Sequence, residues 1–238
     1  MTLLLAVDTS GKNGSLALAR AMPGETEIDV LEIVPLAGGA FSTQLVPQIA
    51  AVLKQHGHTK RDLGAFAVVS GPGSFTGLRV GLAAIKALAE ALQKPIVAIS
   101  LLEAVARSGA SRGRVLSALD AGRGDVYAGD YEFDSQEHKQ ASMRSERLLS
   151  REECIAEINI AENSAEKRWN TVATPDNALA ELFRKAGIEV ELIEYPNAGV
   201  IARLGWARLQ RGETVLPEEL EANYIRHSDA EIFSKPVQ

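Results

Sequence analysis

The sequence is poor in the residues that build disulfides and metal sites. It has one cysteine, Cys154, and four histidines among 238 residues. A single cysteine excludes a disulfide framework and a cysteine metal site. His56 and His58 are two positions apart, which points them to different faces of a helix, and neither His138 nor His227 has a neighbour at ligand spacing. We therefore expect no metal site and no bound cofactor.

A surplus of positive charge is also missing. The chain has 25 Lys and Arg against 31 Asp and Glu, a formal charge of −6, and an isoelectric point near 5.4. Because phosphate contacts dominate affinity for nucleic acids, a protein that binds RNA or DNA alone normally carries a basic surplus. Direct binding of tRNA by the isolated chain is disfavoured, although Arg112, Arg114 and Arg123 could touch RNA inside a complex.

Long hydrophobic runs are absent as well. No segment approaches the ~18 apolar residues of a membrane helix. The opening "MTLLLAVDTSG" has no basic region, its apolar run is short, and Asp8 interrupts it. This pattern predicts a first strand rather than a signal peptide. We expect a soluble, cytoplasmic protein.

The sequence does contain an ordered series of strand and helix patterns. Apolar runs bounded by glycine, asparagine and proline predict strands, and apolar residues at a spacing of three and four predict helices. In chain order these elements are strands at 3–9, 15–20 and 28–34, a helix at 42–55, a strand at 65–70, a helix at 75–92, a strand at 95–100 and a helix from about 101.

The same order returns in the second half of the chain. Its elements are strands at 115–121, 126–133 and about 143–149, a helix at 151–158, a strand at 170–174, a helix at 175–187, a strand at 190–194 and a helix at 197–212. Asp8 and Asp120 occupy matching places, each at the end of the first strand of its set. The repeat predicts an α/β protein with two halves of similar topology, each a mixed sheet flanked by helices, and a boundary near 102–113.

A glycine-rich loop, "SGPGSFTG" at 70–77, follows one strand and precedes a long helix. It lacks the lysine of the G-x-x-x-x-G-K-[ST] phosphate loop, and its spacing departs from the G-x-G-x-x-G dinucleotide motif. A loop that feeds a helix N-terminus, with Ser74 or Thr76 as cap, can still hold an anion. The other interpretation is a tight turn that needs glycine for its backbone geometry. The loop alone does not decide between them.

The helix after this loop has little charge. Between 78 and 92 the charged residues are Arg79, Lys86 and Glu90, which form one narrow stripe. A surface helix needs an apolar stripe of only about 100°, whereas this helix is apolar around most of its circumference. We expect two buried faces, either because the helices of 42–55 and 75–92 pack between two domains or because they form an oligomer interface.

Asp8 and Asp120 are the best acid-base candidates. An aspartate at a strand end before a glycine turn can bind magnesium or orient a water, and it can equally cap the turn through its own backbone. For Asp120, followed by "AGRGD", the turn is the favoured interpretation. Ser10 has no nearby histidine and no G-x-S-x-G elbow, so serine catalysis is not expected.

Several segments together resemble the TsaB (YeaZ) family, bacterial proteins required for making threonylcarbamoyladenosine in tRNA. The segments are "LAVDTS" with "GSLALA", "SGPGSFTGLRVGLAAIKALA", "LDAGRGDVYAGDY" and "PEELEANYIR". The resemblance runs from residue 3 to about 227. It implies two tandem ribonuclease-H-like, actin-like (ASKHA) domains, each with a mixed five-stranded sheet flanked by helices. The implied domains are 1–105, joined by the C-terminal segment from about 213, and 106–212.

The resemblance also implies a role without catalysis. The catalytic paralogue TsaD carries metal-binding histidines at i,i+4 on its first helix, whereas 41–48 here are "FSTQLVPQ". TsaB-like proteins are non-catalytic partners that dimerise with TsaD through the first two helices, and the ATPase TsaE joins the assembly. We expect a scaffold that is a homodimer when alone and meets tRNA only through the complex. The residues expected at the partner interface are Leu45, Ile49, Val52, Leu78, Leu82 and Ile85.

Under this interpretation the glycine loop is architectural. Any nucleotide site formed by Asp8, Thr9, Ser10, Gly71 and Gly73 is then a degenerate inheritance. Two rival classes of function stay open. One is an active ATPase or sugar kinase of the same fold, and the other is a glycoprotease-like peptidase, which the missing metal ligands and nucleophile disfavour.

Overall fold

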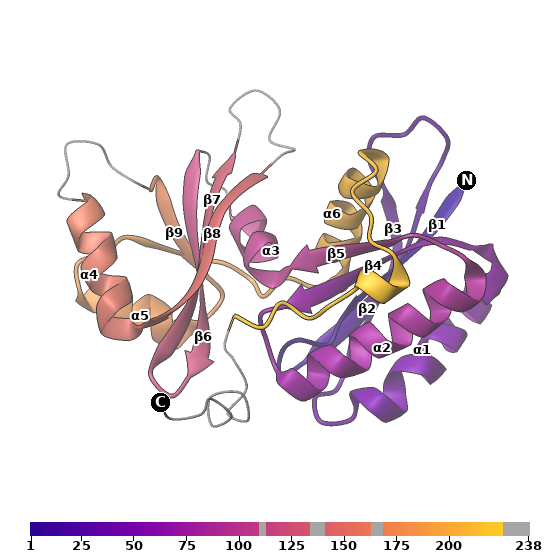
Figure 1. Ribbon diagram of the computed structural model, residues 1–238, viewed down its shortest axis with the longest axis horizontal. Helices are drawn as coiled ribbons and strands as arrows, with labels where there is room; N and C mark the ends of the chain where they lie inside the picture. The colour runs from indigo at the N-terminus through magenta and orange to yellow at the C-terminus, as the bar shows by residue number, and fades with distance from the viewer. Residues whose placement is uncertain (110–112, 134–140, 163–168, 226–238) are drawn as a thin grey trace, which may run out of the picture. The chain divides into compact units, whose positions relative to one another are not determined.

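The computed structural model describes residues 1–109, 113–133, 141–162 and 169–225 (Figure 1). Arg112, His138 and His227, named above, lie outside these residues. Contacts divide the chain into two compact units. The first contains Met1–Ser108 and Glu194–Ala222, and the second contains Gly109–Ile193 and the residues from Asn223 onward.

The first unit is built on a five-stranded sheet in the order β3-β2-β1-β4-β5. Its strands are β1 (Thr2–Asp8), β2 (Gly14–Ala21), β3 (Asp29–Leu36), β4 (Leu63–Gly71) and β5 (Ile96–Ser100). The first three strands form an antiparallel meander, and β4 and β5 continue the sheet in parallel with β1. The run 3–7 of β1 is fully buried, as expected for a central strand with both faces covered.

Helices cover both faces of this sheet (Figure 1). Helix α1 (Phe41–Gln55) and helix α2 (Phe75–Leu92) lie side by side on one face, and α6 (Ala198–Gln210) crosses β1, β2, β4 and β5 on the other. Helix α3 (Leu101–Ser108) packs against β4, β5 and α6. Two short 3₁₀ turns, η1 (Lys60–Asp62) and η2 (Pro217–Glu219), complete the unit.

The second unit repeats this plan. Its sheet has the order β10-β9-β6-β7-β8, again with an antiparallel meander followed by two parallel strands. The strands are β6 (Arg114–Gly122), β7 (Asp125–Phe133), β8 (Ala141–Ser150), β9 (Thr171–Thr174) and β10 (Val190–Leu192). The predicted fold class, two mixed five-stranded sheets flanked by helices, is confirmed.

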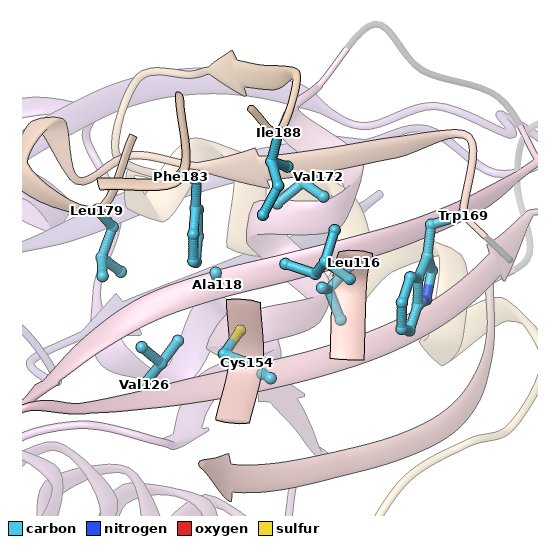
Figure 2. Packing of buried hydrophobic residues seen from close by; sticks show 11 residues of the cluster. Leu116, Ala118, Val126, Cys154, Trp169, Val172, Leu179, Phe183 and Ile188 are labelled. Atoms are coloured by element: carbon cyan, nitrogen blue, oxygen red, sulfur yellow. The ribbon is translucent and has the colours of Figure 1, made fainter. Parts of the chain in front are cut away.

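Helix α4 (Arg151–Glu162) and helix α5 (Asn177–Lys185) pack on the second sheet and close its core (Figure 2). Cys154 of α4 and Phe183 of α5 meet strand residues such as Leu116 in one apolar cluster. Burial raises the pKa of the Cys154 thiol to about 12. The thiol is therefore protonated at neutral pH and acts as a small apolar side chain.

The division of the chain differs from the domain boundaries implied by the sequence. The expected second domain ended at 212, but α6 packs on the sheet of the first unit, which takes Glu194–Ala222. The close packing of α6 on this sheet depends on the small residue Gly205. A side-chain carbon there would lie 2.5 Å from the Cβ of Ala67 in β4, so only glycine lets α6 approach the strand this closely. The helical period of 197–212 gives no sign of which sheet it faces.

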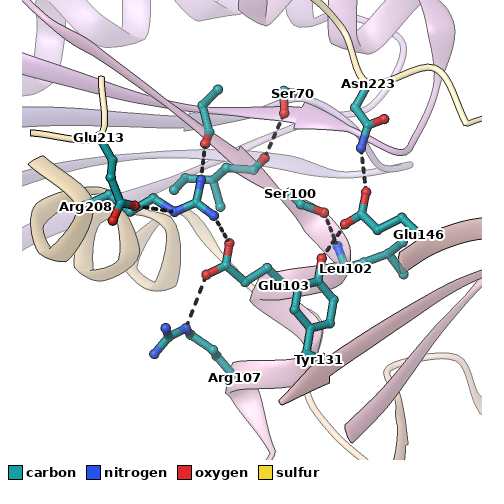
Figure 3. A network of polar contacts seen from close by, with 12 residues as sticks. Ser70, Ser100, Leu102, Glu103, Arg107, Tyr131, Glu146, Arg208, Glu213 and Asn223 are labelled. Atoms are coloured by element: carbon teal, nitrogen blue, oxygen red, sulfur yellow. Dashed lines mark hydrogen bonds and ion pairs between the residues drawn. The ribbon is translucent and has the colours of Figure 1, made fainter. Parts of the chain in front are cut away.

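A buried charge network also holds α6 on the first unit (Figure 3). Arg208 of α6 donates to Glu103 of α3 at 2.5 Å and to the Ala98 carbonyl of β5 at 2.7 Å. Arg107 donates to the other oxygen of Glu103 at 3.4 Å. In the second unit, Tyr131 and Asn223 both donate to Glu146.

Candidate functional site

Asp8, Thr9 and Ser10 lie where β1 ends, and all three are buried. Asp8 accepts hydrogen bonds from the backbone N–H of Ser10 at 2.8 Å and from its hydroxyl at 2.5 Å. Thr9 donates from its hydroxyl to the Gly77 carbonyl at 2.7 Å. The carboxylate of Asp8 therefore closes its own turn, and only 1% of the residue is exposed.

The glycine loop packs directly against this turn. It begins at Gly71, whose φ of +138° favours glycine, and ends at the N-cap of α2, Ser74. The N–H of Ser74 donates to the Ser10 carbonyl at 2.7 Å, and the N–H of Gly77 donates to the Ser74 hydroxyl at 3.3 Å. Two N–H groups that a phosphate cradle would offer to a ligand are used inside the chain.

Three glycines are required by close approach to Thr9 and Ser10. A Cβ on Gly73 would lie 2.5 Å from the Ser10 carbonyl oxygen, and one on Gly77 would lie 2.1 Å from the Thr9 carbonyl oxygen. A Cβ on Gly81 would lie 2.4 Å from the Thr9 hydroxyl. Real Cβ atoms do not come this close to other atoms. Glycine therefore serves the packing of α2 onto the end of β1.

Tyr195, a residue that sequence reasoning missed, covers the same turn. It precedes α6, and its hydroxyl lies 2.8 Å from the position of a Cβ on Gly11. Tyr195 is 43% exposed as a whole, but its hydroxyl end is hydrogen-bonded to the Ser10 side chain, and loss of solvent there together with the nearby carboxylate of Asp8 raises its pKa above the usual range. No local pattern predicts this contact, because Tyr195 and Ser10 are far apart in the sequence.

The structure thus brings Asp8, Thr9, Ser10 and Gly73 together, as the sequence suggested, but with their polar groups bonded to one another. Gly71 is the last residue of β4 and sets the start of the loop. The Asp8 carboxylate is buried, and the N–H groups of Ser74 and Gly77 are bonded inside the chain. This geometry favours an architectural role for the loop.

We expect Gly77→Ala to destabilise the protein by about 3 kcal/mol, as severe overpacking does. In an ordinary helix the same change stabilises by about 1 kcal/mol because alanine has the higher helix propensity. The sign reverses here because the added carbon overlaps the Thr9 carbonyl. Urea unfolding followed by circular dichroism measures the change. Thr76→Ala, at the exposed neighbouring position, is the control, and an alanine at 77 that left stability unchanged would contradict the packing.

The buried Asp8 predicts a pH-dependent stability. Burial raises the pKa of Asp8 above its ordinary value of 3.8, against the two Ser10 hydrogen bonds that lower it. Above pH 3.8 the folded chain therefore holds this proton more tightly than the unfolded chain, and the wild type loses stability as the pH rises through the folded pKa. In Asp8→Asn this loss is absent. The stability of the variant relative to wild type should rise between pH 4 and pH 7, by about 1.4 kcal/mol for each unit separating the two pKa values.

Asp62→Asn provides a control of opposite sign. Hydrogen bonds from the Thr59 N–H and hydroxyl lower the pKa of Asp62. Its contribution to stability is present above the unfolded pKa and is lost as the pH falls, so this variant should lose stability relative to wild type as the pH rises. If the stability of both variants relative to wild type changed with pH in the same direction, the raised pKa of Asp8 would be refuted.

Asp120 does not repeat the environment of Asp8. It is exposed and pairs with Arg151 of α4 at 3.2 Å. The expected turn-capping role is thus replaced by an ion pair on the second unit. The two aspartates share a place in the topology but not a chemistry.

His56 is part of a structural contact. His56, the C-cap of α1, contacts Glu32 of β3 through Nε2 at 2.8 Å. Within the described residues, no group of three or more His, Cys, Asp or Glu side chains is arranged to hold a metal ion. Over the same part of the chain, no helix is long and apolar enough to cross a membrane.

The six residues predicted for the partner interface are buried inside the chain, which contradicts that prediction. They are each at most 8% exposed: Leu45, Ile49, Val52, Leu78, Leu82 and Ile85. Large apolar residues at helical spacing filled the core of the chain itself. They leave almost no surface for a partner to contact.

The opposite side of α1 and α2 carries an exposed apolar surface, here called the outer face. It consists of Val46, Pro47, Ala50 and Ala51 of α1 and Phe75, Ala83, Ala87 and Ala91 of α2, all exposed. Val46 is 60% exposed and Phe75 is 41% exposed. The sequence signal was the alanine-rich side of α2, which is unusually poor in charge for a surface.

Comparison with known proteins identifies the family of this chain. A family model described as "TsaD: tRNA N6-adenosine threonylcarbamoyltransferase" matches residues 33–232. The tRNA threonylcarbamoyladenosine biosynthesis protein TsaB of Escherichia coli is 28% identical over 239 residues, covering 95% of this chain and 96% of that protein. TsaB of Bacillus subtilis is 34% identical over 131 residues, which is 55% of each chain.

A solved structure, YeaZ from Pseudomonas aeruginosa, superposes with a TM-score of 0.69 at 26% identity. The match covers 93% of this chain and 100% of the YeaZ chain. The chain therefore belongs to the TsaD family of the matching model and, within it, to the TsaB/YeaZ group.

Proposed function

We propose that this chain is a non-catalytic subunit in the biosynthesis of threonylcarbamoyladenosine in tRNA. It dimerises with a TsaD-type transferase through the outer face and supports binding of a TsaE-type ATPase. When the transferase is absent, a second copy covers the same face. The observation that carries this proposal is the closed turn of Asp8, Thr9 and Ser10.

Catalysis in an actin-like protein needs a nucleotide or metal held against polar groups of the chain. Here Asp8 is bonded to Ser10, and the N–H groups of Ser74 and Gly77 are bonded to Ser10 and Ser74. Opening such a turn would leave several buried polar groups unsatisfied, at about 1–3 kcal/mol each. A non-catalytic subunit that acts by binding its partner does not require this turn to open.

The outer face supports the partner half of the proposal. Exposed apolar residues gathered on one side of two neighbouring helices are typical of an interaction site, and a specific interface buries about 800 Å² on each partner. Alanines such as Ala83 and Ala87 let a second helix approach closely. The core residues Leu82 and Ile85 are buried beneath this face and anchor α2 in the first unit.

Reconstituted transfer of the threonylcarbamoyl group to tRNA tests the proposal. The assay contains threonylcarbamoyl-AMP, tRNA, and TsaD and TsaE from the same organism, with and without this chain. A third arm replaces TsaD by this chain. We expect modified tRNA only when this chain and TsaD are both present.

The other outcomes separate the rival functions. Full activity without this chain would refute the scaffold role, and activity when it replaces TsaD would make it catalytic. Stoichiometric ATP hydrolysis by the pure chain would favour the kinase or ATPase alternative. Proteolysis that a chelator abolishes would favour the peptidase.

A further inference from the structure

We infer that Arg123, at the tip of the β6–β7 hairpin, contacts a backbone phosphate of the tRNA when this chain is assembled with a TsaD-type transferase. The inference rests on the proposed function, because it needs the complex of this chain with the transferase. It adds a direct contact with the tRNA and names the side chain that makes it.

The structure separates the arginines that the sequence offered for contact with RNA. Arg114 is engaged inside the second unit, where it donates to the two carboxylate oxygens of Asp130 at 2.8 Å and 2.6 Å and lies over the ring of Trp169. Arg112 lies outside the described residues. Arg123 is exposed and lies at the turn between β6 and β7. Of Arg114 and Arg123, it is therefore Arg123 that presents its side chain to a large partner.

The backbone at Arg123 is in a conformation that arginine adopts reluctantly. Gly122 pairs with Asp125, so Arg123 and Gly124 form a two-residue hairpin loop with φ values of +58° and +89°. A positive φ at both positions is typical of a type I′ turn, in which asparagine followed by glycine is favoured. A side chain such as that of arginine is strained in this left-handed region.

The strain at Arg123 has no local structural purpose. Among the described residues, Gln93 is the other non-glycine residue with a positive φ, +54°. Gln93 caps the end of α2, and its side-chain amide donates to the Glu90 carbonyl at 2.7 Å, so its conformation completes a helix end. At the hairpin tip, asparagine would form the same turn more easily. A residue kept in an unfavourable conformation indicates a site where its side chain is needed.

The hairpin that carries Arg123 is anchored. The N–H of Arg151, the first residue of α4, donates to the Gly124 carbonyl at 3.0 Å, and the Arg151 guanidinium pairs with Asp120 at 3.2 Å. The carboxylate of Asp120 is thus engaged by Arg151, and Asp125, the other carboxylate of the hairpin, is partly buried. A side chain mounted on a fixed hairpin loses less freedom when it binds than one on a loose loop.

A phosphate of tRNA fits this side chain. The planar guanidinium presents paired N–H donors that match the oxygens of a phosphate. The chain carries a formal charge of −6, so it lacks the broad positive surface that would bind RNA alone, and a single contact inside a complex is what its charge allows. TsaB of Escherichia coli is named for the biosynthesis of a tRNA modification, which makes tRNA the phosphate-bearing partner.

Three replacements separate the charge of Arg123 from the strain of its backbone. Arg123→Lys keeps the charge and the strain, Arg123→Gln keeps the strain alone, and Arg123→Asn removes both. We expect Arg123→Asn to raise the melting temperature by about 2–4 °C, because asparagine suits the turn. Arg123→Lys and Arg123→Gln should melt within about 1 °C of wild type. Circular dichroism measures these temperatures and shows that every variant folds.

Fluorescence anisotropy of labelled tRNA measures the affinity of the complex formed by the full chain and TsaD. Arg123→Gln and Arg123→Asn should weaken tRNA binding about threefold to tenfold, although one variant is more stable than wild type and the other is not. The slope of log affinity against log salt concentration should become shallower by about 0.7–0.9, the loss of one phosphate contact. Arg123→Lys should stay within about twofold of wild type.

Two controls make this measurement specific. Arg203→Gln removes the same charge from an exposed position on α6 and should leave the affinity for tRNA unchanged. A tRNA that TsaD does not modify should lose affinity by the same factor as the substrate tRNA, because a phosphate contact carries no sequence information. A loss in Arg123→Gln no larger than in Arg203→Gln would overturn the inference.

The remaining outcomes also decide. If the Arg123 variants bind TsaD more weakly while the assembled complex binds tRNA normally, the arginine contacts a carboxylate of the partner protein and the inference is wrong. Normal stimulation of threonylcarbamoyl transfer with tRNA affinity independent of Arg123 sinks the inference alone. Tight binding of tRNA that depends on Arg123, without stimulation of transfer, sinks the proposed function alone. A chain that does not bind TsaD would refute both.

Discussion

Val46→Arg is expected to lower TsaD-dependent threonylcarbamoyl transfer at least about tenfold while the chain stays folded. Val46 is 60% exposed in α1, so an arginine there meets solvent in the isolated chain and helix propensity is preserved. In the complex the guanidinium would be buried without a partner, at about 2–5 kcal/mol. The reconstituted assay measures the loss, and co-purification with TsaD shows whether binding is its cause.

Ile160→Arg is the matched control for this experiment. Ile160 is a β-branched residue on α4 of the second unit and is 73% exposed. It lies outside the outer face, so arginine there should leave transfer unchanged. Equal activity of Val46→Arg and Ile160→Arg would show that TsaD does not bind at the outer face.

Glu103→Ala is expected to reduce the free energy of unfolding by about 3–5 kcal/mol, as removal of one member of a buried ion pair does. Glu103 is 3% exposed and is shared by Arg107 and Arg208. Burial already lowers the pKa of Arg107, an effect that Glu103 opposes. Without the carboxylate, two partly buried guanidinium groups face each other where α6 meets α3. Urea unfolding measures the change.

Two further variants make this test specific. Glu103→Gln keeps an acceptor oxygen for Arg208 and should lose less stability than Glu103→Ala. Glu181→Ala, at an exposed position on α5, should stay within about 0.5 kcal/mol of wild type. A loss at Glu103 no larger than at Glu181 would mean that the network does not hold α6 in place.

Local patterns were sufficient for the order of elements. The apolar runs at 3–9 and 115–121 and the helical spacing at 75–92 are local patterns that depend only on which neighbouring residues are buried. Each segment forms the expected strand or helix. The repeated β-β-β-α-β-α-β-α order predicted two similar sheets, since connection lengths and hairpins limit how such a series folds. The absence of an i,i+4 histidine pair could also be recognised from the sequence, because two metal ligands on one helix lie only four residues apart.

The closed turn was only half predictable. Asp8 before a glycine turn suggested capping or catalysis, and the choice depends on what covers it. The covering groups are the glycine loop and Tyr195, which come from distant parts of the chain. Gly77 and Gly81 read as ordinary helix residues until their distance to Thr9 is known.

The sequence by itself determined that this chain forms two α/β halves, that α1 carries no i,i+4 histidine pair, and that α1 and α2 are apolar on more than one side. Only the tertiary structure decided which side faces outward and to which sheet α6 belongs. Helical period shows that a face is buried but does not identify what buries it. That choice depends on close approaches such as Gly205 to Ala67 and on the Glu103–Arg208 pair, whose members are joined only by folding.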